Sequence, residues 1–189
     1  MKIENFKVYG LEDSIRRAKF PMSVDTSSLN NDLTKGIASL AKSKSGEGHD
    51  QWLTGVVVQF DVTGSLKWWT EAQRYHFLDF VSSQSTMHRI TRFDIESQCN
   101  EYVSAEMIDI LNSLVNVYND NPTPENYLWV LYNIPTGFQL TAGMTTNYRQ
   151  LKTIYHQRKT HRLPEWRVFC KWIESLPHSE LIVGDVVGE

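Results

Sequence analysis

Features of secreted, membrane or metal proteins are scarce in this sequence of 189 residues. Cysteine occurs only as Cys99 and Cys170, which are far apart and lack metal-ligand spacing, so we expect reduced thiols and no metal site. No run of about 18 apolar residues occurs, and the first residues lack the hydrophobic segment of a signal peptide. These absences predict a cytoplasmic protein that makes no contact with a membrane.

A surplus of positive charge is also missing. Lys and Arg number 19 against 22 Asp and Glu, which gives a net charge of -3. Duplex nucleic acid is therefore not an expected partner, because it requires a broad basic surface. Glycine-rich phosphate loops, dinucleotide fingerprints and nucleophile elbows are absent as well. Any phosphate binding must come from a local cluster of cations.

Aromatic residues, by contrast, are plentiful: the chain has 6 Trp, 8 Tyr and 8 Phe at an ordinary hydrophobic content of 41%. A chain of this length buries a core of its own, and aromatic side chains beyond the needs of a core commonly line sites for planar ligands. We therefore expect a single domain over residues 1–189 that has a ligand site.

Hydrophobic periodicity predicts several helices and few strands. Alternating apolar residues over 52–63 are typical of a strand, and 136–146 is predicted to be a strand or an extended loop. Polar runs predict a mobile loop at about 42–48 and a second loop at 82–86. Helices are expected at 27–42, 65–81, 104–117, 124–132, 147–158 and 163–173. Helices that outnumber strands in this order predict the α+β class.

One of these helices carries polar residues along its apolar side. Asn147, Leu151 and Arg158 are spaced by four and seven residues and therefore share a face. An amide and an arginine at the ends of an apolar stripe favour a pocket for an anion or a planar polar ring, and Arg149 adds a further cation. The alternative is a core helix whose arginines are solvated.

A second cluster begins with Arg74, Tyr75 and His76 and continues through a hydroxyl-rich run to Arg89. Hydroxyl groups and cations at a helix end offer hydrogen bonds and positive charge to a phosphate. Arg74 and His76 are two residues apart, so on a helix they would point in different directions. The alternative interpretation is an ordinary serine-rich turn.

These segments, taken in order, resemble the flavin-dependent thymidylate synthases over about residues 16–174. Residues 48–62 resemble the Gly-His segment of that family and the strand after it, and 74–76 stand in the place of its Arg-His-Arg signature. Residues 134–151 resemble its Leu-Pro and Asn-x-Arg-x-Leu segment. Arg158 and Glu165 follow at nearly the positions of the family.

The resemblance implies a homotetramer with sites between subunits, in which FAD assists the transfer of a one-carbon unit from a methylene-folate to C5 of a pyrimidine deoxynucleotide. It implies a single α+β domain of this type, with helices packed on a small sheet. The residues that it assigns to FAD are Arg74, His76, Asn147 and Arg149. The residues that it assigns to the nucleotide are Ser85, Arg158 and, in place of a missing signature arginine, Arg89.

Departures from the family pattern leave three functions open. Tyr75 and His76 replace a histidine and an arginine of the signature, Gly55 replaces a flavin-contacting histidine, and Leu131 replaces a nucleotide-binding arginine. Each lost charge-assisted hydrogen bond removes roughly 1.5–3 kcal/mol. The chain is therefore expected to be a thymidylate synthase-like enzyme, a relative with an altered product such as a hydroxymethylated base, or a catalytically degenerate nucleotide-binding or scaffolding protein.

Overall fold

The structure is a computed structural model that describes residues 1–44 and 46–184. Its strands are β1 (Lys2–Tyr9), β2 (Val57–Ser65), β3 (Asp79–Ser83) and β4 (Gln139–Asn147). Within the described residues these strands form one antiparallel sheet in the order β1-β2-β4-β3. β2 and β4 pair along their whole lengths and form the centre of the sheet.

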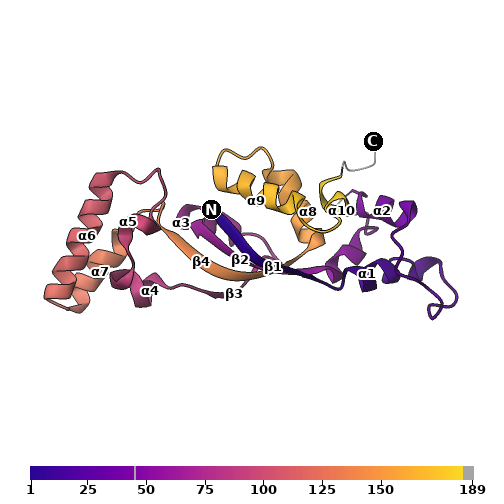
Figure 1. Ribbon diagram of the computed structural model, residues 1–189, viewed down its shortest axis with the longest axis horizontal. Helices are drawn as coiled ribbons and strands as arrows, with labels where there is room; N and C mark the ends of the chain where they lie inside the picture. Colours follow the sequence, from indigo (N-terminus) through magenta and orange to yellow (C-terminus); the bar gives the residue numbers. More distant parts are fainter. Residues whose placement is uncertain (45, 185–189) are drawn as a thin grey trace.

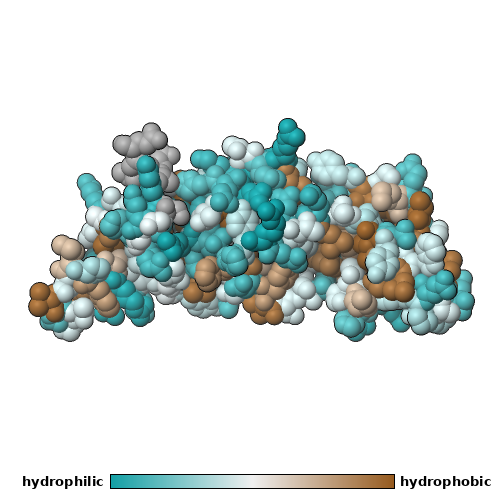
Figure 2. Space-filling model, turned by 180° about the vertical axis from the view of Figure 1, so that it is seen from behind, coloured by the Kyte–Doolittle hydropathy of each residue, from teal (hydrophilic) through white to brown (hydrophobic). Residues whose placement is uncertain are grey.

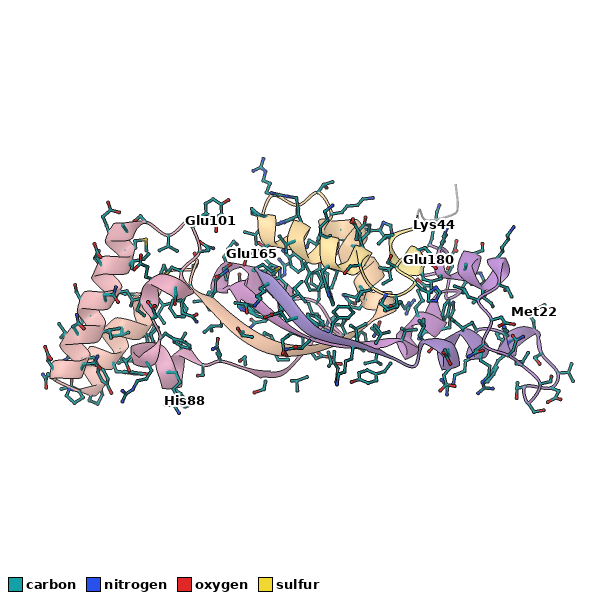
Figure 3. All side chains as sticks on the ribbon, in the orientation of Figure 1. Met22, Lys44, His88, Glu101, Glu165 and Glu180 are labelled. Atoms are coloured by element: carbon teal, nitrogen blue, oxygen red, sulfur yellow. The ribbon has the colours of Figure 1, made fainter. Side chains whose placement is uncertain are left out.

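The helices gather on one face of the sheet and at its two ends (Figure 1). Those over the face are α8 (Tyr148–Arg158), α9 (Pro164–Glu174) and α10 (Glu180–Val183). One end is built from α4 (Thr86–Arg89), α5 (Ile95–Gln98), α6 (Ala105–Asp120) and α7 (Pro124–Tyr132). The other end holds α1 (Leu11–Arg17) and α2 (Lys35–Ala41), and α3 (Leu66–Ala72) follows β2 directly. Met22 lies near one end of this elongated molecule (Figure 3), and α6 forms the other end (Figure 1).

The covered face of the sheet holds the larger of two hydrophobic clusters. Val58, Phe60 and Val62 of β2 point into it at exposures of 2% or less, as the alternation over 52–63 predicts. Trp68 of α3 and Trp166 of α9 meet there with ring centroids 5.2 Å apart. Each fully buried apolar side chain contributes about 1.5–3 kcal/mol, so this cluster fastens α3 and α9 to the sheet.

A smaller cluster lies at the end formed by α6 and α7. Its fully buried members are Ile90 after α4, Leu111 of α6, Val130 of α7 and Phe138 before β4. Leu140 of β4 belongs to this cluster, whereas Met144 of the same strand belongs to the larger one. β4 therefore runs through both clusters and connects them.

The uncovered face of the sheet is polar. Gln59 of β2 is exposed, and Thr63 of β2 and Thr141 of β4 face each other across the strands with their hydroxyl oxygens 2.7 Å apart. Because these positions alternate with the buried ones, the two central strands have one apolar and one polar face.

The helix predicted over 65–81 is wrong in its second half. α3 ends at Ala72, and Asp79–Ser83 form the edge strand β3, which pairs with β4. The strand uses the apolar residues that suggested a longer helix: the Phe80 ring lies 4.9 Å from that of Trp69. The loop predicted at 82–86 is wrong for the same reason, because its first residues belong to β3 and its last begins α4. Pairing with a distant strand is a tertiary effect that local periodicity does not contain.

The predicted boundaries near the N-terminus also differ. The helix expected at 27–42 is limited to α2, where Thr34 Oγ1 accepts a hydrogen bond from the Ile37 amide at 3.3 Å. Before it, Asp25 Oδ1 accepts hydrogen bonds from Ser27, a local pattern that competes with helix formation. The strand expected from residue 52 begins at Val57, after a 3₁₀ helix, η2 (Gln51–Gly55). β1 and α1 were not predicted.

Other elements confirm the sequence analysis. α7 spans the predicted residues with Pro124 in its first turn, α6 begins after Ser104, and β4 fills most of the segment 136–146. α9 starts at Pro164, although the short α10 follows it. The described part of 42–48 contains no helix or strand; Ser45 lies outside the described residues, and the mobility of this loop stays a prediction. None of the described helices is long and apolar enough to cross a membrane.

Candidate functional site

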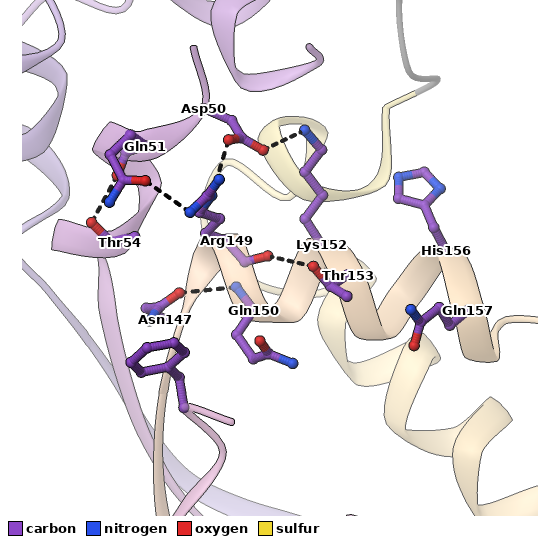
Figure 4. Close-up of a pocket in the computed structure, with 11 residues that line it drawn as sticks. Asp50, Gln51, Thr54, Asn147, Arg149, Gln150, Lys152, Thr153, His156 and Gln157 are labelled. Carbon is purple, nitrogen blue, oxygen red and sulfur yellow. Dashed lines mark hydrogen bonds and ion pairs between the residues drawn. The ribbon is translucent and has the colours of Figure 1, made fainter. Parts of the chain in front are cut away.

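A pocket of about 700 Å³ lies where β4 passes into α8 (Figure 4). Its volume is within the range of sites for small ligands, roughly 300–1,000 Å³. The lining comes from η2 and the preceding Asp50, from Phe77, from Asn147, and from one side of α8 as far as Gln157. Sequence segments that are far apart therefore meet at this point.

Asn147 is the last residue of β4 and the N-cap of α8. Its Oδ1 accepts a hydrogen bond from the Gln150 amide at 2.9 Å, which satisfies one of the free amides at the helix start. The side-chain nitrogen of Asn147 makes no hydrogen bond with any described residue, so it is available to a ligand. The expected helix start at Asn147 is thereby confirmed, and its amide has two separate tasks.

Arg149 is held at the edge of the pocket by two partners. Its Nε donates to Asp50 Oδ1 at 3.0 Å, and its Nη1 donates to Gln51 Oε1 at 2.8 Å. A guanidinium has five N–H donors, so most of them remain without a partner among the described residues. With 31% of its side chain exposed, Arg149 presents an oriented positive charge to the pocket.

Asp50 is fixed in turn by Lys152, whose side chain is only 6% exposed. Lys152 Nζ donates to Asp50 Oδ2 at 2.9 Å and to the carbonyl oxygens of Ala41 at 2.7 Å and Ser43 at 2.6 Å. This buried cation ties the segment 41–50 to α8 and sets the position of the carboxylate that holds Arg149. Sequence analysis missed both residues; the signal was a lysine next to Leu151 on the buried side of a predicted helix.

Arg158 does not share this pocket. The pocket lining reaches the preceding residue, Gln157, but the side chain of Arg158 is held by a different group of residues. Its Nε donates to the Tyr75 hydroxyl at 2.7 Å, its Nη1 lies 3.3 Å from Glu71 Oε2, and its guanidinium lies 4.8 Å from the centre of the Trp166 ring. The pocket therefore extends along α8 as the shared helical face predicts, but Arg158 is engaged within the chain and is not one of its lining residues. The alternative of a solvated arginine is wrong, since the side chain is only 18% exposed.

Glu71 is the centre of the charged cluster around Arg158. Trp166 Nε1 donates to it at 2.9 Å, and Lys67 Nζ and His161 Nε2 lie 3.3 and 3.7 Å from its oxygens. Partial burial acts to raise the pKa of Glu71, but the hydrogen bonds from Trp166 and Lys67 and the charge of His161 outweigh it and lower the pKa. Lys67, Glu71 and His161 also line a second pocket of about 760 Å³.

Glu165, which the family resemblance also includes, lies at the start of α9 and is buried. Its carboxylate accepts hydrogen bonds from the Ser65 amide at 2.8 Å and the Ser65 hydroxyl at 2.6 Å. It therefore joins α9 to the junction of β2 and α3. This position orients the elements that carry Trp166 and Glu71.

The remaining predicted site residues lie outside the pocket at the start of α8. Arg74 and His76 lie beyond the end of α3, so they do not occupy different faces of a helix. Both are exposed, and their side chains bond to no described residue, although the Arg74 amide donates to the Glu71 carbonyl oxygen at 3.3 Å. Ser85 is half-buried at the N-cap of α4, and Arg89 is exposed at the end of that helix. Of the segment 73–78, it is Phe77 that lines the pocket.

Gly55, which stands where the family has a flavin-contacting histidine, packs closely against α1. A Cβ atom at this position would clash with the Ser14 hydroxyl oxygen. A histidine at this position therefore requires the Ser14 hydroxyl to rotate away. Among the described residues, no three His, Cys, Asp or Glu side chains gather as a metal site, and both cysteines are free.

Solved structures that are similar to this chain include flavin-dependent thymidylate synthases. One is the enzyme ThyX from Helicobacter pylori complexed with FAD and dUMP, at a TM-score of 0.73, 15% identity, and coverage of 96% of this chain and 98% of that chain. Another structure of ThyX from Helicobacter pylori, with FAD and dUMP at 2.31 Å, gives a TM-score of 0.74 at 15% identity, with 97% of each chain covered.

No protein-family model matches the sequence, and comparison with curated proteins also gives no match. The structural likeness establishes the class: the chain has the α+β fold of the flavin-dependent thymidylate synthases over nearly its whole length. The fold class expected from the sequence and the resemblance from which it was inferred are both confirmed at this level.

Proposed function

We propose that the protein binds FAD in the pocket at the start of α8 and transfers a one-carbon unit to C5 of a pyrimidine deoxynucleotide. The observation that carries this proposal is the Arg149 guanidinium, held by Asp50 beside the free amide nitrogen of Asn147. These residues lie in a fold whose Helicobacter pylori member is complexed with FAD and dUMP.

The residues of the pocket fit a flavin nucleotide. Its phosphate groups require cations and N–H donors, which Arg149 and the amides at the start of α8 offer. Its planar ring requires an apolar surface and a few polar groups, which Phe77 and the Asn147 amide offer. When bound, FAD supplies the electron-transfer chemistry, and the protein supplies binding, orientation and electrostatics.

Arg74 and His76 are proposed to complete the FAD site from another copy of the chain. Both side chains are exposed and have no partner among the described residues, so they are available at a subunit interface. This arrangement requires the homotetramer that the family resemblance implies. Ser85, Arg89 and Arg158 are proposed for the deoxynucleotide, with methylene-folate as the one-carbon donor.

A catalytically degenerate nucleotide-binding or scaffolding relative is the second candidate, and one observation favours it. Arg158, the expected nucleotide ligand, is already bound to Glu71 and Tyr75 and covered by Trp166. Tyr75 replaces a signature histidine of the family, so the contact that engages Arg158 is itself one of the departures. Under this hypothesis the charged cluster stabilises the fold and no nucleotide reaches Arg158.

The test is to purify the protein, record its flavin absorbance, and titrate it with FAD. The protein is then incubated with FAD, a reductant, methylene-tetrahydrofolate and dUMP, and the nucleotide is examined by mass spectrometry for a methyl or hydroxymethyl group at C5. Arg149→Ala is the matched control and should lose FAD affinity. A colourless protein that rejects FAD and leaves dUMP unchanged would establish the degenerate relative instead.

A further inference from the structure

Phe77 has a backbone conformation that is unusual for its type. Its φ is 61°, in the left-handed region that bulky non-glycine residues rarely adopt. Asn5 and His178 also have positive φ values, but asparagine and histidine are among the types that tolerate this region. A phenylalanine in this region has a strained backbone, and such strain persists only where the surrounding structure enforces it.

The surroundings of Phe77 do enforce it. The Thr146 hydroxyl donates a hydrogen bond to the Phe77 carbonyl oxygen at 2.7 Å, which attaches this residue to β4 immediately before Asn147. The next residue, Leu78, is 3% exposed and belongs to the larger hydrophobic cluster. The backbone is thus fixed on both sides of the strained residue.

The side chain of Phe77 is not buried by this arrangement. It is 63% exposed and lines the pocket at the start of α8 together with Asn147, Gln150 and Arg149. A hydrophobic ring that the backbone turns away from the core, into a pocket with amide and guanidinium groups, has no packing role within the chain. Planar ligands use such a ring as a stacking surface.

We propose that Phe77 is the stacking wall of this pocket and that its ligand carries a planar heteroaromatic ring. The identification of this ring as the isoalloxazine of the flavin rests on the function proposed above. Phe77 would fix the plane of the ring, while Asn147 and Arg149 contact its polar edge or the attached phosphate. Phe77 is then a positioning residue of the binding site that the signature motif does not include.

The experiment titrates wild type and variants with riboflavin, which has the ring without a phosphate, and with dUMP as a second planar ligand. Phe77→Ala should weaken riboflavin binding about tenfold, whereas Phe77→Trp should retain it within about threefold, since either ring can stack. Met22→Ala is the control, because Met22 is 94% exposed, lies far from α7 (Figure 3) and is outside the pocket. It should leave binding unchanged.

The outcomes separate the inference from the proposed function. Riboflavin that binds wild type and Phe77→Ala equally would overturn the stacking role and leave the flavin function standing. A wild type that binds neither riboflavin nor dUMP would overturn both. Light scattering is measured on Phe77→Ala as well. If this variant loses binding because its oligomeric state has changed, Phe77 is an interface residue and the inference is overturned.

Phe77→Gly gives a second readout. Glycine adopts a positive φ without a steric penalty, so this variant should lose riboflavin affinity as Phe77→Ala does while its melting temperature stays the same or rises. A melting temperature that falls by several degrees would show that the ring stabilises the fold, and would contradict a role in ligand binding.

Discussion

At the scale of single residues, Lys152 carries the largest expected effect on stability. Lys152→Met leaves the buried Asp50 carboxylate with Arg149 as its one remaining cation and removes three hydrogen bonds. Breaking a buried ion pair on one side costs about 3–5 kcal/mol, which urea unfolding measures. Lys171→Met, on the exposed side of α9, is the control and should change stability by less than about 0.5 kcal/mol. Equal unfolding curves for the two variants would refute the structural role of Lys152.

Arg158 is expected to act on stability as well as on the ligand. Arg158→Ala removes the cation–π contact with Trp166 and the ion pair with Glu71, so we expect a loss of about 2 kcal/mol in thermal or urea unfolding. If Arg158 also holds a nucleotide phosphate, dUMP binding should weaken by more than about tenfold, and Arg158→Lys should restore only part of it. A stability loss without any change in dUMP affinity would favour the degenerate relative.

Protonation of Glu71 should make the stability contributed by the same cluster depend on pH. Its pKa is lowered in the folded protein, from an ordinary value of 4.5, so the stability that it contributes is present above that value and is lost as the pH falls through the folded pKa. Unfolding of the wild type at pH values from 7 down to 3 should show this loss below about pH 4.5. Glu71→Gln should be less stable at pH 7 and show a smaller loss on acidification. Parallel pH profiles for the two proteins would contradict the prediction.

At the scale of elements, the junction of β4 and α8 has two tasks that a pair of variants can separate. Asn147→Asp retains an N-cap acceptor but replaces the free amide nitrogen by a charged oxygen, whereas Asn147→Ala removes both. We expect Asn147→Ala to lose about 0.5–2 kcal/mol of stability and Asn147→Asp to lose little. Both variants should bind FAD more weakly in a fluorescence titration. Asn147→Ala lacks the amide donor, and the carboxylate of Asn147→Asp also repels the phosphate groups. FAD binding that survives in Asn147→Asp would limit Asn147 to capping.

The elements that could be predicted from the sequence are those that local interactions determine. Asn147 begins α8 because a capping amide precedes an apolar stripe, and Pro124 begins α7 for a similar reason. β3 was missed because its pairing partner is distant in sequence, and a short exposed edge strand has weak periodicity of its own. Asp50 and Lys152 were missed because their ion pair spans 102 positions, so neither residue predicts the other.

The residues of the candidate site were likewise predictable only where local sequence determines their position. Arg149 and Asn147 were predicted as FAD ligands, and the structure brings them together in one pocket. Arg158 was predicted on the same helical face, but its hydrogen bonds with Tyr75 and Glu71 hold it in a different cluster. Arg74 and His76 were assigned through the signature motif alone, and within one chain the structure leaves them at the surface.

At the scale of the whole molecule, we predict that copies of the chain assemble into an oligomer. Trp129 is 58% exposed and Leu128 49% exposed on α7, and Figure 2 shows hydrophobic side chains at the end formed by α4 to α7. A site completed by Arg74 and His76 of another copy requires at least a dimer and, by the family resemblance, a tetramer. Light scattering at micromolar concentration should give the mass of a tetramer. A monomer would exclude sites shared between subunits.

The position of β4 in both hydrophobic clusters has a consequence for hydrogen exchange. Neither cluster can open fully without disturbing this strand, whose amides and carbonyls bond to β2 on one side and β3 on the other. We expect the central amides of β4 to exchange with solvent only when the whole chain unfolds. Asn147 ends that strand, so the floor of the pocket is as rigid as the most protected part of the protein, and ligand entry must depend on the segments around it.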